Sequence, residues 1–148
     1  MRITKKADKE NRPNNTTKIN LIVYSGKNKS LDRKFYSSIS HLFPKKQISL
    51  HTTIVGLAKD LNKFDNNHKI IIYFVTSKFE LDNLACHKNL LSDRPTIFIL
   101  PNQKQDFLTN AFKLYPKFIS YQQSYIKDVP LVLQKMINNF NLKEVIQK

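Results

Sequence analysis

The sequence predicts an α/β domain in which five parallel strands form one doubly wound sheet with helices on both faces. Strand-like and helix-like segments alternate five times along 148 residues, which is typical of parallel strands joined by right-handed crossovers. The segment 69–76, KIIIYFVT, is an almost unbroken β-branched and aromatic run, which indicates a strand covered on both faces. The segment 96–100 is a second such run. Both strands are therefore expected inside the sheet.

The first two strand–helix units come before the central run. The segment 18–24 has the apolar pattern of a strand. The helix after it is expected to begin at the N-cap Ser30 and to end at Pro44, because serine caps helices and proline stops them. The segment 47–54 alternates apolar and polar residues, which favours a half-exposed edge strand. Apolar residues at helical spacing then predict a second helix, at Leu57, Leu61 and Phe64.

The other three units continue the alternation. Helices are expected over 79–91 and 107–114, and a fifth strand over 117–122. The last helix is expected to begin at the N-cap Asp128, with Pro130 in its first turn, where proline is tolerated. A flavodoxin-like strand order of 2-1-3-4-5 suits this pattern, because it places strands one, three and four inside and the alternating second strand at an edge.

The composition is strongly basic. The net charge is +14, from 25 basic and 11 acidic residues. Such a charge favours nucleic acid, anionic lipid or acidic proteins as partners, but codon bias toward lysine and asparagine would produce the same excess. Base-reading proteins rely on arginine, which occurs here only at Arg2, Arg12, Arg33 and Arg94.

Residues 1–17 are basic and have no apolar periodicity, so we expect a disordered arm before a domain that spans 18–148. No apolar run approaches the roughly 18 residues of a membrane span, and the N-terminus does not resemble a signal peptide. Cys86 is the single cysteine, which fits a reducing cytoplasm. Cys86 is expected to be buried and His87 exposed; with so few ligands, no metal site is predicted.

The order of the elements and two segments carry a resemblance to a known family. These are the segment 69–91 and the strand RPTIFIL at 94–100, followed by a last helix opened by an acid and a proline. In this respect the chain resembles the response-regulator receiver (CheY-like) family over 18–141. The resemblance implies a (βα)5 fold with its chemistry at the carboxyl ends of the strands.

The family's chemical groups are missing from the matching positions. The resemblance implies an acidic pair after strand one, an aspartate after strand three, a hydroxyl after strand four and a lysine after strand five. This chain has other residues there: Ser25 and Gly26, Phe74 and Thr76, Pro101, and Gln123. Because Mg²⁺ needs carboxylate oxygens and an acyl phosphate needs a carboxylate nucleophile, we predict a pseudo-receiver that is not phosphorylated. It would be a non-enzymatic module without a cofactor.

Two other function classes stay open beside this signalling module. A receiver-like module would bind a protein partner with an acidic or mixed surface, and the expected contact residues are Lys113, Tyr115, Tyr121, Gln123, Tyr125 and Lys127. The first alternative is a protein that binds nucleic acid or an anionic surface weakly and without sequence preference. The second is a flavodoxin-like site for FMN or another nucleotide at the loop SGKNKS, residues 25–30, although phosphate loops usually contain more glycine.

Overall fold

The computed structural model describes residues 18–26, 31–63, 67–91 and 94–147. Five parallel strands form one sheet in the order β2-β1-β3-β4-β5, which confirms the predicted fold. The strands are β1 (Ile19–Ser25), β2 (Ile48–His51), β3 (His68–Phe74), β4 (Thr96–Leu100) and β5 (Phe118–Tyr121). The predictions for the arm at 1–17, for Ser30 and for Phe64 fall on residues outside the described ranges.

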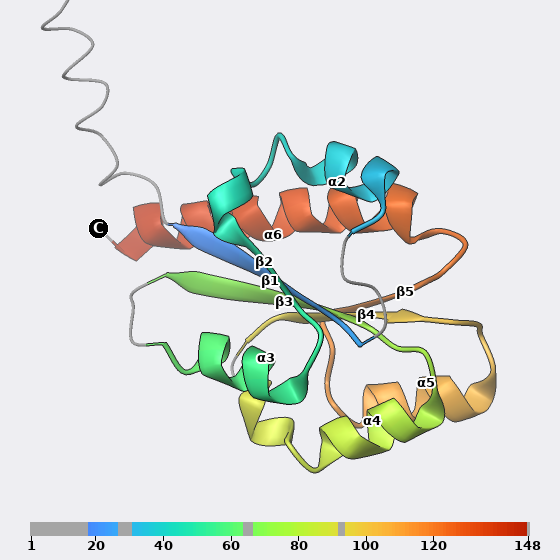
Figure 1. The fold of residues 1–148 in the computed structure, drawn as a ribbon. Helices are drawn as coiled ribbons and strands as arrows, with labels where there is room; N and C mark the ends of the chain where they lie inside the picture. Colours follow the sequence, from blue (N-terminus) through green and yellow to red (C-terminus); the bar gives the residue numbers. More distant parts are fainter. Residues whose placement is uncertain (1–17, 27–30, 64–66, 92–93, 148) are drawn as a thin grey trace, which may run out of the picture.

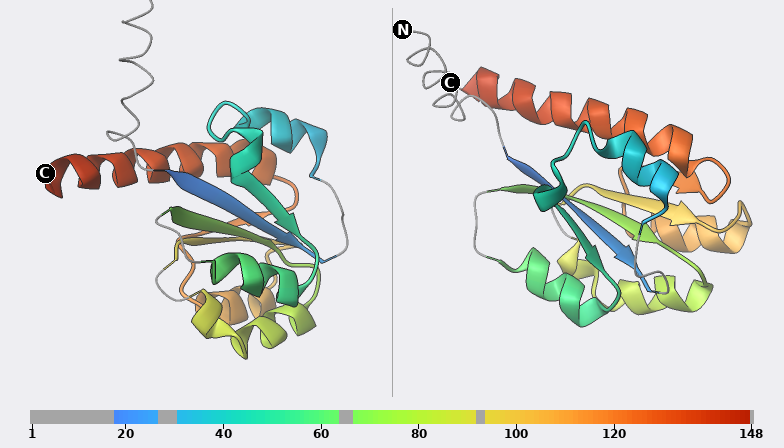
Figure 2. Two further views of the ribbon diagram at one scale, coloured as in Figure 1. Left: turned by 60° about the vertical axis from the view of Figure 1, so that its left-hand side comes forward. Right: turned by 45° about the horizontal axis from the view of Figure 1, so that its top comes forward.

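Helices cover both faces of the sheet, so the domain has three layers (Figure 1). The α-helices are α2 (Arg33–Ile39), α3 (Ile54–Leu61), α4 (Lys78–Ala85), α5 (Gln105–Phe112) and α6 (Tyr125–Gln147), and two short 3-10 helices are η2 (Lys45–Gln47) and η3 (Lys88–Leu90). Helices α2 and α6 lie on one face, and α3, α4 and α5 lie on the other, as the turned views show (Figure 2). None of the helices in the described ranges is both long and apolar enough to cross a membrane.

Strand β3 contributes to both halves of the core. Ile70, Ile72 and Phe74 pack against α2 and α6, while Ile71 and Tyr73 face the layer of α3, α4 and α5. Successive side chains of a strand point to opposite faces, so a strand covered on both sides must be apolar at every position. This confirms the interpretation of the central run.

Strand β2 lies at the edge of the sheet, as its alternating pattern predicted. All its residues are half-buried. The strand is shorter than the expected 47–54, because Thr53 caps the next helix: its hydroxyl accepts a hydrogen bond from the Gly56 N–H at 3.0 Å. Ile54 is therefore the first residue of α3 rather than the last residue of the strand.

Two predicted helix starts are wrong. Helix α2 is capped by Asp32, whose carboxylate accepts hydrogen bonds from the Lys34 and Phe35 N–H groups. A carboxylate at this position also interacts favourably with the helix dipole. Helix α6 begins at Tyr125, so Asp128 lies in its first turn instead of capping it, and Pro130 lies inside the helix.

One side chain expected to be buried is exposed. Cys86 was predicted to be buried, but α4 ends at Ala85 and Cys86 is an exposed residue of the turn that follows. Phe79, at the start of the predicted helix over 79–91, is 75% exposed, because the buried residues of α4 are Leu81 and Leu84. His87 is exposed, as predicted.

The central strand should not tolerate a charge. Ile72 is completely buried, and an unpaired buried carboxylate costs several kcal/mol. Because a domain of this size is stable by only about 5–15 kcal/mol, we expect Ile72→Asp to unfold the protein, with loss of the circular dichroism of the native state. Val55→Asp is the control, because Val55 is 65% exposed. Cooperative thermal unfolding of Ile72→Asp near the wild-type temperature would contradict the assignment of β3 as the core strand.

Candidate functional site

Ligands of doubly wound sheets usually bind where the strand order reverses, at the carboxyl ends of the strands. In this protein that place lies between β1 and β3, where Ser25 pairs with Phe74. The chain leaves β1 toward α2 on one face and leaves β3 toward α4 on the other face (Figure 1). Ser25, Phe74, Pro101 and Gln123 are thus brought to one edge of the sheet, because each lies at or just beyond the carboxyl end of a parallel strand.

An aromatic cluster fills this edge on the side of α2 and α6. The Phe74 ring meets the Tyr125 ring edge-on, with centroids 5.2 Å apart. The Phe35 ring lies 5.1 Å from Tyr125 and 6.3 Å from Phe74. Phe74 is 9% exposed and Tyr125 is 8% exposed. The central strand therefore ends in packed rings, and Tyr125, one of the predicted partner-binding residues, is largely buried among them.

Two tyrosines stack on the other side of the sheet. The rings of Tyr24 and Tyr73 lie 4.3 Å apart at an angle of 21°. Burial raises the pKa of both phenols, and the rise is larger for Tyr73. The Tyr73 hydroxyl donates to Tyr24, which raises the pKa of Tyr73 and lowers that of Tyr24. Both hydroxyls are thus kept in the neutral form.

Glu80 lies close to this edge and caps the start of α4. Its carboxylate accepts hydrogen bonds from the Thr76 N–H and from the Thr76 hydroxyl. The Ser77 hydroxyl in turn accepts from the Glu80 N–H at 3.3 Å. This reciprocal arrangement resembles a capping box. A Cβ on Gly26 would lie 3.0 Å from the second carboxylate oxygen, so a small residue is needed there.

The edge offers no built metal centre within the ranges that the structure describes. No group of three or more histidine, cysteine, aspartate or glutamate side chains is placed to hold a metal ion there. Glu80 already accepts two hydrogen bonds from Thr76 at one of its carboxylate oxygens. The side chains at this edge pack against one another and cap α4. No carboxylate stands at the end of β3 to accept a phosphoryl group.

The predicted partner-binding residues do not form one patch. Lys113 and Tyr115 precede β5, so they lie at the amino edge of the sheet. Tyr121, Gln123 and Lys127 follow or end β5, at the carboxyl edge. The strand between the two groups has four residues, which is about 13 Å at 3.3 Å per residue.

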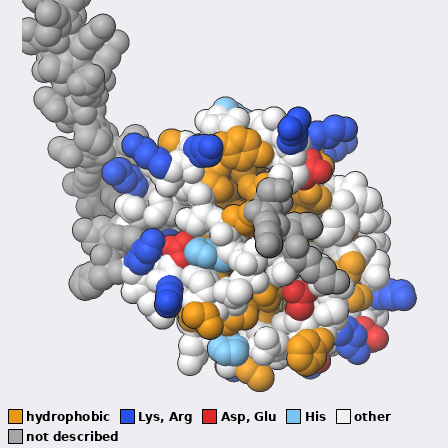
Figure 3. Space-filling view, viewed as in Figure 1, with side chains coloured by type: hydrophobic (Ala, Val, Ile, Leu, Met, Phe, Trp, Pro, Cys, Tyr) orange, Lys and Arg blue, Asp and Glu red, His pale blue; other side chains and the backbone are white. Residues whose placement is uncertain are grey.

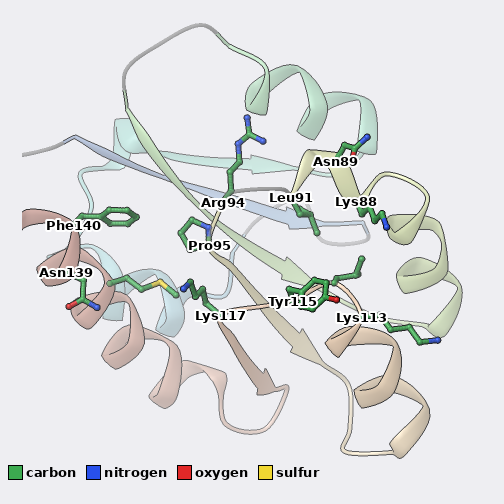
Figure 4. Close-up of a pocket in the computed structure, with 12 residues that line it drawn as sticks. Lys88, Asn89, Leu91, Arg94, Pro95, Lys113, Tyr115, Lys117, Asn139 and Phe140 are labelled. Atoms are coloured by element: carbon green, nitrogen blue, oxygen red, sulfur yellow. The ribbon is translucent and has the colours of Figure 1, made fainter. Parts of the chain in front are cut away.

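The amino edge holds a pocket that the sequence analysis did not predict. It has a volume of about 710 Å³. Figure 4 shows Asn139 and Phe140 of α6 on one side, Lys113 and Tyr115 on the other, and Lys117 between them. The basic side chains of the lining are Lys88, Arg94, Lys113 and Lys117. Among the described residues no carboxylate lines the pocket or pairs with the three lysines.

Arg94 joins three elements at this pocket. Its guanidinium donates hydrogen bonds to the Leu90 carbonyl and to the Leu61 carbonyl, both at 2.9 Å. These carbonyls belong to the last residues of η3 and α3, where a cation also interacts favourably with the helix dipole. Arg94 is therefore a fixed positive charge that holds two helix ends against the start of β4.

A second hollow continues the pocket along the same edge. It has a volume of about 250 Å³ and shares Arg94, Pro95 and Phe140 with the first. Lys63, His68 and Lys69 add to its lining. The His68 and Phe140 rings stack at 4.5 Å. The two hollows together make an elongated groove with basic and aromatic walls, which we call the amino-edge groove.

The residues that form this groove are far apart in the sequence. Arg94 and Lys117 stand just before strands β4 and β5, and Lys113 follows a helix. Only the parallel sheet brings these positions together with Lys88 and Phe140. Comparison with protein-family models, curated proteins and solved structures gave no match to this chain.

The buried tyrosines should make the fold sensitive to alkali. Burial raises the pKa of Tyr24, Tyr73 and Tyr125, so the folded protein retains phenolic protons that the unfolded chain releases above about pH 10. The unfolded state then binds fewer protons, and the free energy of unfolding must fall as the pH rises. We expect urea unfolding to show this fall between about pH 9 and pH 11. Tyr73→Phe should reduce the slope; an unchanged slope would contradict the burial of this hydroxyl.

Proposed function

We propose that the chain is a non-catalytic, receiver-like regulatory module that acts by binding a protein partner and is not switched by phosphorylation at its carboxyl edge. The observation that carries this proposal is the packing of Phe74 at the end of the central strand. A phosphorylatable site at that position needs an accessible carboxylate nucleophile, and the ring packs instead against Phe35 and Tyr125.

The capped acid supports the same proposal. Glu80 is held by Thr76 through one carboxylate oxygen at the start of α4, so this acid has a structural role as part of the helix cap. Loss of a helix cap costs about 1 kcal/mol. The strand order 2-1-3-4-5 and the two helices on one face with three on the other are those of the receiver fold, but fold alone does not assign a function.

The surface proposed for the partner is the carboxyl side of β5 and the start of α6. Gln123 and Lys127 are exposed there, and Tyr121 is half-buried. A tyrosine next to polar groups suits the centre of an interface. The charge of +14 favours a partner with an acidic or mixed surface, because charge raises the rate of encounter with such a partner.

The first prediction concerns phosphorylation. Incubation of the intact protein with acetyl phosphate and Mg²⁺ should leave its mass unchanged, because β3 ends in Phe74, which packs into the core, and not in a carboxylate. Beryllofluoride should likewise leave the amide spectrum unchanged. The measurements are intact-mass spectrometry and nitrogen-15 correlation spectra. A stoichiometric, acid-labile phosphoryl adduct on an aspartate or glutamate would overturn the proposal.

The second prediction concerns the partner. The tagged protein should retain a defined protein from an extract of its source cells at about 0.2 M salt, where weak electrostatic binding to nucleic acid is largely lost. The double variant Tyr121→Ala, Lys127→Ala should lose that protein. The control Val55→Ala, Lys59→Ala changes one apolar and one basic residue on α3 and should retain it. Equal retention by both variants would show that the interface lies elsewhere.

A further inference from the structure

The amino-edge groove combines features that the proposed protein-binding surface does not need. It lies at the opposite ends of the strands from Gln123 and Lys127. Three exposed lysines, Lys88, Lys113 and Lys117, line its larger pocket. Lys88 belongs to η3, and the other two lie in the connection between α5 and β5. No carboxylate among the described residues pairs with these lysines, so their positive charge is available to a bound anion.

Tyr115 is the second unusual feature of the groove. Its side chain is 90% exposed, and its backbone has a φ of 54°, which makes it the one non-glycine residue with positive φ in the described ranges. This conformation costs a non-glycine residue about 1–2 kcal/mol, and helices that end in this way usually have glycine there. Neither backbone preference nor burial explains a tyrosine at this position. A residue kept in an unfavourable conformation is a candidate for function.

We propose that the amino-edge groove binds single-stranded nucleic acid, with phosphates at Lys88, Lys113 and Lys117 and a base stacked on the ring of Tyr115. Proteins that bind single strands without sequence preference combine a basic groove with exposed aromatic rings in this way. The scarcity of arginine in the chain fits such binding, because bidentate base reading is not required. This proposal does not depend on the protein-binding function of the carboxyl edge.

The shape of the groove favours a single strand over other anions. The two hollows, of about 710 and 250 Å³, share a wall and run along the ends of several strands, so an extended polyanion fits better than one phosphate. A duplex is a convex rod whose bases are stacked inside it, and it cannot place a base face on a ring that lines a pocket. An acidic peptide would satisfy the lysines but has no flat π-face for Tyr115 unless it also carries aromatic residues.

The positive charge of the protein is not confined to the groove. Lysine and arginine side chains are spread over the face seen in Figure 3. Any test must therefore separate this groove from general attraction between a basic protein and a polyanion. Arg94 is unsuitable for that purpose, since its guanidinium also holds the ends of α3 and η3.

The charge test uses two double variants of the full chain that each remove two exposed lysines. One is Lys113→Ala, Lys117→Ala in the groove. The matched control is Lys34→Ala, Lys104→Ala, at the start of α2 and at the N-cap of α5, on the carboxyl side of the sheet. Fluorescence anisotropy with a labelled oligothymidylate of about 12 nucleotides gives the affinity at 50 mM and 200 mM salt, values that span the range over which phosphate contacts weaken.

Three lysine–phosphate contacts predict a slope of about −2 in log affinity against log salt for a single strand. The groove variant should reduce the magnitude of that slope by about 1.4 and weaken binding at least tenfold at the lower salt. The control variant should stay within about threefold of the wild type if binding is local to the groove. Equal losses for the two variants, or no binding by the wild type, would overturn the proposal.

The ring test separates stacking from stability. Tyr115→Gly should keep or raise the melting temperature, because glycine adopts positive φ readily, yet it should weaken oligothymidylate binding about fivefold or more. Tyr115→Phe keeps the ring and should bind like the wild type. The proposal fails if Tyr115→Gly binds normally, or if a duplex of equal length, polyglutamate or thymidine monophosphate competes as well as the single strand does.

Discussion

The burial of β3 on both faces is the constraint on which the rest of the structure depends. Its alternate residues pack into two separate clusters, one under α2 and α6 and one over α3, α4 and α5. Because both faces of the strand are apolar, neither face can be left to water, and five helices are needed to cover the sheet. Pairing with β1 and β4 on its two sides then sets the strand order, and with it the two edges where loops can carry function.

The same constraint explains why the two edges differ in character. At the carboxyl edge the apolar pattern of β3 continues to its last residue, and Phe74 joins the core through Phe35 and Tyr125. The polar groups that remain there, Thr76 and Glu80, are used to begin α4. At the amino edge the chain enters its strands through polar and basic residues, so charge and exposed rings gather in that groove instead.

The sequence predicted the features that depend on long apolar patterns. It did not predict where helices begin and end, because these positions depend on the conformation of a single turn. The strand order and the buried central run follow from periodicity alone. Serine and aspartate both cap helices well, so the residue type does not decide between Ser30 and Asp32. The structure shows that the Asp32 carboxylate accepts the hydrogen bonds from the first turn of α2. Cys86 is exposed because α4 ends one residue before it. Tyr125 is largely buried because it begins α6, which packs on the sheet. The amino-edge groove joins residues as distant in sequence as Lys88 and Phe140, which no spacing rule connects.

The distance between the two edges decides how they can influence each other. The four residues of β5 that separate the groove from the β5–α6 end span about 13 Å at 3.3 Å per residue. This exceeds the Debye length of about 8 Å at physiological salt, so the lysines of the groove act only weakly on a charge at the carboxyl edge. Coupling would instead have to pass through the packed strands and helices that lie between the two edges. The simplest consequence is a domain whose two edges bind independently, so that a protein held at the β5–α6 end and a polyanion held in the groove can be present together without changing each other's affinity.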